Sequence, residues 1–81
     1  MTRTVEEIVV DTIAQQQRID PATVTPESEL AGLSITSLDA ITLAYELEEA
    51  LGVEIPDSDI DSLRTVQDVI DGMHRLIHDK V

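Results

Sequence analysis

Apolar residues recur every three or four positions along three stretches of this chain, which is the spacing that places them on one face of a helix. The clearest stripe begins at Val66 and continues without a break to Ile77. A threonine, a common helix N-cap, precedes each stretch, and no segment alternates with the period of a half-buried strand. The pattern predicts three amphipathic helices: Thr4 to Arg18, Thr36 or Ser37 to Leu51, and a last helix capped by Thr65.

Two connections join these helices. The first, Ile19 to Ile35, contains two prolines and is too long to be an idle loop in so small a chain, so we expect its apolar residues to attach it to the core. In the second, Gly52 stands where a left-handed helix cap belongs, and a short helix is predicted over Asp57 to Leu63. The sequence therefore predicts an all-α fold, a small up-down bundle of three main helices plus one short helix, with residues 1–81 as a single domain.

Composition and charge exclude several classes of protein. The chain has 81 residues, 17 of them acidic and 5 basic, and a formal net charge of −12, which argues against binding to nucleic acid or to an anionic membrane. The absence of cysteine excludes disulfides, Cys-ligated zinc and a thiol nucleophile. No apolar run approaches the roughly 20 residues of a membrane span, and the first residues lack the apolar stretch of a signal peptide. We expect a cytoplasmic protein that does not insert into membranes.

The acidic residues are concentrated in the middle of the chain. Between Ile19 and Leu63 there are 11 acidic residues and no lysine or arginine. So many negative charges repel one another and destabilise the folded chain, so we expect them to serve a function. We interpret this span as a docking surface for partners with basic surfaces. The candidate docking residues are Asp39, Glu46, Glu48, Glu49, Glu54, Asp57, Asp59 and Asp61, together with Thr36 and Leu38 at the start of the second helix.

Other patterns that could carry chemistry are incomplete. The aspartates from Asp57 to Asp61 match the first positions of a calcium-loop template, but Ser62 stands where that template needs glycine. His74 and His78 lie one helical turn apart without a third ligand nearby. No Ser/His/Asp arrangement and no Gly-rich phosphate loop is evident. We therefore expect no metal site, and a protein that holds a substrate rather than an enzyme.

The segment Leu30-Ala31-Gly32-Leu33-Ser34-Ile35-Thr36-Ser37-Leu38-Asp39-Ala40 carries the most specific signal. It places Ser37 at the end of a long loop, at the start of a helix and inside the acidic span. A serine there is, by itself, an ordinary N-cap. A helix N-terminus also favours a phosphate group, because its backbone N–H groups are unpaired and its dipole end is positive.

This segment resembles the attachment loop of the acyl carrier proteins, in which Leu-Gly-x-Asp-Ser-Leu precedes a recognition helix. Leu33, Ser37 and Leu38 stand at matching positions, and the resemblance continues through residues 47–57 and 65–70. It implies that Ser37 carries 4′-phosphopantetheine, transferred from coenzyme A by a phosphopantetheinyl transferase. The terminal thiol of this arm would hold an acyl group as a thioester and deliver it to acyl-consuming enzymes in fatty-acid, polyketide or other specialised biosynthesis, after acyl-loading enzymes have charged it.

Two positions depart from the family pattern. Thr36 replaces an aspartate, and Ser34 replaces a glycine at a point where the loop can need an unusual backbone conformation. These departures suggest a specialised carrier with dedicated partners. They also leave open an acidic interaction module without a prosthetic group, or an aminoacyl or peptidyl carrier. The peptidyl-carrier signature, Gly-Gly-His/Asp-Ser-Leu, is absent, which favours the acyl type.

The resemblance also implies an acyl pocket between the second, short and last helices. Family members often have smaller residues where Ile60 and Val69 stand, so we expect a shallow pocket and a short or polar cargo. The start at Met1 and the short tail suggest a free-standing protein, and we expect a monomer. The predicted lining residues are Leu43, Leu47, Ile55, Ile60, Leu63 and Val69.

Overall fold

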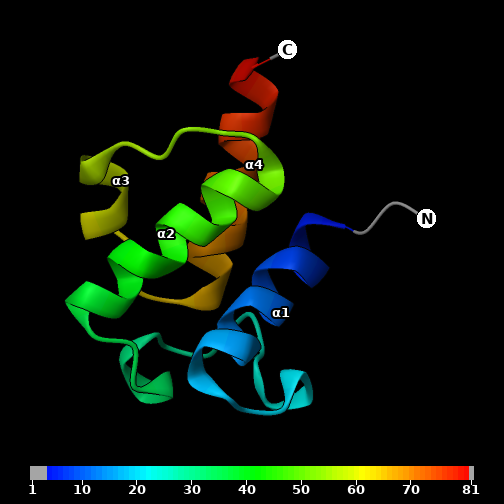
Figure 1. Cartoon of the computed structure of the whole chain (residues 1–81), viewed down its shortest axis with the longest axis vertical. Helices are drawn as coiled ribbons and strands as arrows, with labels where there is room; N and C mark the ends of the chain where they lie inside the picture. The colour runs from blue at the N-terminus through cyan, green and yellow to red at the C-terminus, as the bar shows by residue number, and fades with distance from the viewer. Residues whose placement is uncertain (1–3, 81) are drawn as a thin grey trace.

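The computed structural model describes residues 4–80 and contains four α-helices and two short 3-10 helices within that range. Figure 1 shows α1, α2 and α4 as the three main helices, and α1 packs against both α2 and α4 while α3 contacts α2. The predicted all-α bundle is confirmed. Within residues 4–80, the one extended pairing is an isolated bridge between Glu29 and Thr65. The elements are α1 (Val5–Gln17), η1 (Pro21–Thr23), η2 (Ala31–Leu33), α2 (Ser37–Leu51), α3 (Asp57–Asp61) and α4 (Val66–Lys80).

Local side-chain chemistry sets the ends of the main helices, as predicted. The Thr4 hydroxyl accepts a hydrogen bond from the backbone N–H of Glu7 at 3.1 Å and so caps α1. Gly52 ends α2 in the left-handed conformation, with φ 66°. Thr65 and Asp68 bond each other's backbone N–H groups, at 3.2 and 3.1 Å, in a capping box at the start of α4.

The core forms where the inner faces of the three main helices meet, and every buried residue in the described chain is apolar. Ile13 of α1, Leu43 and Leu47 of α2, and Ile70 of α4 are each at most 1% exposed. Full burial of one such side chain contributes about 1.5–3 kcal/mol. The long connection adds its own buried residues, Val24 and Leu30, and is thereby attached to the core as expected.

The short helix is shorter than predicted. It was expected over Asp57 to Leu63, but α3 ends at Asp61. The backbone tightens at its end, where the N–H of Ser62 donates to the carbonyl of Asp59 at 3.2 Å and the Ser62 hydroxyl donates to the same oxygen at 2.9 Å. A serine that satisfies a nearby carbonyl in this way competes with helix continuation.

Candidate functional site

The loop before α2 turns sharply at Ser34, whose φ of 65° and ψ of 25° lie in the left-handed region. Its N–H donates to the carbonyl of Ala31 at 3.1 Å, and the N–H of the next residue, Ile35, donates to Leu30 at 3.0 Å. Ile35 is buried and attaches the end of the turn to the core. The loop therefore does need a left-handed residue where this chain has serine, as expected from the family's glycine.

Thr36, and not Ser37, is the N-cap of α2. The Thr36 hydroxyl accepts from the N–H of Asp39, and the Asp39 carboxylate accepts from the N–H of Thr36, both at 3.2 Å. Ser37 is the first helical residue, it is exposed, and its hydroxyl makes no hydrogen bond with any residue of the described chain. The capping role is thus already filled, and the Ser37 hydroxyl is accessible for a reaction.

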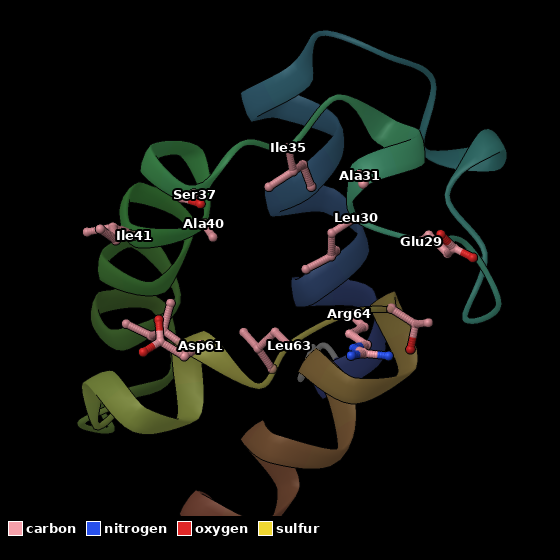
Figure 2. A pocket seen from close by; sticks show the side chains of 12 residues that line it. Glu29, Leu30, Ala31, Ile35, Ser37, Ala40, Ile41, Asp61, Leu63 and Arg64 are labelled. Carbon is pink, nitrogen blue, oxygen red and sulfur yellow. The ribbon is translucent and has the colours of Figure 1, made fainter.

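A pocket of about 700 Å³ lies beside Ser37, between the start of α2 and the segment that joins α3 to α4. Figure 2 shows Leu30, Ala40 and Leu63 around the space that Ser37 overlooks. Charged residues also line the pocket, namely Glu29, Asp61 and Arg64. The pocket thus combines apolar and charged lining residues with the exposed Ser37 hydroxyl. Its apolar lining consists of Leu30, Ala31, Ile35, Ala40, Ile41, Ile60 and Leu63.

The structure distributes the residues predicted to line an acyl pocket between two environments. Ile60 and Leu63 line the pocket beside Ser37, and both are half-buried. Ile55 and Leu63 line a second cavity of about 420 Å³ that α4 also borders. The remaining three are at most 1% exposed and belong to the core: Leu43, Leu47 and Val69. Spacing alone did not indicate Leu30 or Ile35 as lining residues, because the path of the long loop brings them to the pocket.

The predicted docking residues differ in their exposure and in whether they form hydrogen bonds within the chain. Glu48 is half-buried, and its carboxylate accepts a hydrogen bond from the N–H of Ile55 at 3.2 Å, so it also ties the following loop to α2. Asp39 is half-buried in the capping box, and Asp59 is half-buried in α3. The other acidic candidates and the two flanking residues are exposed: Glu46, Glu49, Glu54, Asp57, Asp61, Thr36 and Leu38.

An apolar stripe that the helix pattern did not single out lies on the outer side of α2. Leu38 is 76% exposed, Ile41 is 41% exposed and Tyr45 is 65% exposed. Their spacing of three and four places them on one face of the helix. Glu46 is the neighbour of Tyr45, and Glu49 lies one turn beyond it. The exposed face of α2 therefore combines apolar and acidic side chains.

Two glutamines of α1 contact the segment around Ser37, which the sequence did not reveal. Gln16 donates from Nε2 to the carbonyl of Asp39 at 2.8 Å, and Gln17 donates from Nε2 to the carbonyl of Leu33 at 2.9 Å. In the sequence these residues were only polar, helix-compatible positions near a helix end. No local pattern shows that a side chain contacts a segment 16 to 23 residues away.

The candidate metal ligands do not come together in the described residues. No group of three or more His, Cys, Asp or Glu side chains there could hold a metal ion. Asp68, which would be the twelfth and last position of a calcium loop that begins at Asp57, accepts hydrogen bonds from the N–H groups of Arg64 and Thr65, both at 3.1 Å. Across the described part of the chain, no helix has the length and apolar character needed to cross a membrane.

The sequence and the structure are both similar to those of known proteins. The family model described as "Phosphopantetheine attachment site" matches residues 7–72. The acyl carrier protein of Syntrophobacter fumaroxidans is 47% identical over 64 residues, which are 78% of this chain and 79% of that protein. The acyl carrier protein of Thermosynechococcus vestitus is 48% identical over 60 residues, which are 73% of this chain and 74% of that protein. The crystal structure of an acyl carrier protein from Thermotoga maritima superposes with a TM-score of 0.83 at 22% identity over the whole of both chains, which shows the shared fold.

The helical bundle presents an exposed serine hydroxyl at a helix start, beside a pocket lined by apolar and charged residues. The chain belongs to the phosphopantetheine-attachment-site family of acyl carrier proteins. Members of this family are carriers and not catalysts, and they act by interacting with enzymes. The residues at the start of α2 fit the prosthetic group, because the hydroxyl is exposed and a separate residue, Thr36, caps the helix.

Proposed function

We propose that Ser37 is the attachment residue for 4′-phosphopantetheine, and that residues 1–81 act as a single acyl-carrier domain. The observation that supports this most directly is the exposed Ser37 hydroxyl at the first position of α2, which has no hydrogen bond within the described chain. Ser34 is also exposed, but it occupies the left-handed turn before the helix. Among the serines of residues 4–80, Ser37 is the one that combines a hydroxyl without a hydrogen bond with the start of a long helix.

The start of α2 favours the phosphate of such a group. The first N–H groups of a helix lack partners inside the helix, and the positive dipole end attracts an anion. When attached, the group supplies a flexible arm and a terminal thiol that holds an acyl group as a thioester. The chain itself has no cysteine, so this thiol has no competitor within it.

The pocket beside Ser37 receives the apolar part of the cargo in this proposal. Its lining is mostly apolar, but the half-buried side chain of Ile60 occupies space at the α3 side. Three of the expected lining residues, Leu43, Leu47 and Val69, are packed in the core instead, and interiors are too dense to hold a large void in reserve. These features favour a short or polar cargo.

The outer face of α2 and the loop after it are the proposed docking surface. It would contact the phosphopantetheinyl transferase and the acyl-loading and acyl-consuming enzymes through basic surfaces on those partners. The exposed residues Glu46 and Glu49 lie beside the apolar stripe that ends at Tyr45, so charge would steer the encounter and apolar contact would hold it. We propose that the protein works as a monomer in the cytoplasm and does not bind nucleic acid.

Incubation with coenzyme A and a broad-specificity transferase tests the attachment residue. Intact mass should rise by one phosphopantetheine group, and tandem mass spectrometry should place it on Ser37. Ser37→Ala should prevent the gain and change the free energy of unfolding by less than about 0.5 kcal/mol, because Ser37 does not cap the helix. Thr36→Ala should cost about 1 kcal/mol by removing the cap. Modification on Ser34, or a mass gain in Ser37→Ala, would contradict the proposal.

A further inference from the structure

The segment that carries Ser37 is tethered to α1 on both sides of the serine. Gln17 donates to the carbonyl of Leu33, four residues before Ser37, and Gln16 donates to the carbonyl of Asp39, two residues after it. The bonds measure 2.9 and 2.8 Å, and both are partly buried. The Ser37 side chain is exposed, whereas the two glutamine contacts on either side of it are partly shielded from water.

These two bonds differ from the other hydrogen bonds of the segment. The N–H groups of Ser34 and Ile35 bond to η2 and the residue before it, and Thr36 bonds to Asp39, so these contacts fix only the local shape. The glutamine bonds reach from a different helix. Together with the bond from the Leu30 N–H to the carbonyl of Arg64 and the burial of Leu30 and Ile35, they fix where the segment, with Ser37 in it, lies relative to the rest of the bundle.

Within the described residues, the Gln16 amide makes one hydrogen bond, to Asp39, and leaves its other polar atom without one. Its other amide atom, Oε1, is buried and has no hydrogen-bond partner in the described structure. A buried acceptor without a partner destabilises a fold, and an apolar side chain of similar length would avoid that cost. What the glutamine contributes at this position is the donor that reaches Asp39.

We propose that Gln16 and Gln17 are positioning residues that hold the attachment segment in the orientation in which the transferase binds it. This inference rests on the proposed role of Ser37. Without a tether, the segment occupies the binding-competent orientation for a smaller fraction of the time, and apparent affinity falls by that fraction. The loss of one such hydrogen bond should raise the KM for the carrier roughly twofold to tenfold. The kcat at saturation stays unchanged, because the bound segment is the same.

The chain provides a matched control in three consecutive glutamines. Gln15 is exposed, and its side chain makes no hydrogen bond with the described residues. We would compare Gln15→Met, Gln16→Met and Gln17→Met, which keep length and helix propensity but remove the amide. Gln16→Glu and Gln17→Glu provide a second pair that keeps the side-chain shape and removes the N–H donor. Three quantities are measured in each variant: the kinetics of phosphopantetheine transfer to Ser37, the amide hydrogen exchange of residues 35–39, and stability to urea.

The positioning role predicts that reactivity and stability separate. The variants at Gln16 and Gln17 should show the raised KM, unchanged kcat and faster exchange over residues 35–39, while Gln15→Met matches the parent chain. Gln16→Met should unfold at nearly the same urea concentration as the parent, because loss of the hydrogen bond to Asp39 and removal of the unpaired acceptor offset each other. The inference would be overturned if the variants at Gln16 and Gln17 had the same KM and the same amide exchange as the parent chain. It would also be overturned if KM rose only in those variants that are less stable to urea, and in proportion to that loss. Transfer to a residue other than Ser37 would instead overturn the proposed function.

Discussion

Replacement of Ser34 by glycine tests whether the turn before α2 is strained. Ser34 has φ 65° in a conformation that costs a residue with a Cβ about 1–2 kcal/mol. Glycine removes this cost but gains freedom in the unfolded chain, which offsets about 0.4–1 kcal/mol. Ser34 is exposed and its hydroxyl makes no hydrogen bond with the described residues, so little else is lost. We expect Ser34→Gly to stabilise the fold by roughly 0.5–1 kcal/mol, around the difference of about 0.8 kcal/mol between the midpoints of the two ranges.

Thermal and urea unfolding followed by circular dichroism measure this difference. For a domain of this size the expected gain corresponds to a Tm increase of roughly 2–8 °C. Ser34→Ala is the control, since it removes the hydroxyl but keeps the Cβ, and it should lie within about 0.5 kcal/mol of the parent chain. Arg18, which ends α1 with φ 57°, offers a second site where glycine should exceed alanine. If Ser34→Gly is no more stable than Ser34→Ala, the argument from backbone strain is wrong.

Two further predictions concern docking and cargo. Reversal of charge at Glu46 and Glu49 should slow acyl transfer to a partner enzyme at low salt and flatten its salt dependence, because both are exposed and steer association. The control is the reversal of Glu6 and Glu7 of α1 together. Equal transfer rates for the two double variants would contradict this docking surface. Ile60→Ala should deepen the pocket beside Ser37, so that a long acyl chain changes the NMR chemical shifts of Ala40 and Leu63 more than it does in the parent. Identical shift changes in the two proteins would contradict the idea that Ile60 makes the pocket shallow.

The helices were predictable because their signals are local. The helix caps depend on backbone groups within a few residues of Thr4, Gly52 and Thr65. Apolar residues spaced three and four positions apart indicate which face of each helix is buried. The family also followed from residues contiguous in the chain. The end of α3 was missed because the Ser62 side chain competes for a carbonyl, an effect of hydrogen-bond geometry that apolar spacing does not record.

The sequence by itself determined the bundle, the acidic span and the position of Ser37 at a helix start. Tertiary structure decided which apolar residues line the pocket and which are packed in the core. It also decided that two glutamines of α1 donate hydrogen bonds to backbone carbonyls on either side of Ser37. These outcomes depend on contacts between segments distant in the chain. Such contacts are set by how the helices pack, whereas caps and helix faces are set by neighbours in sequence.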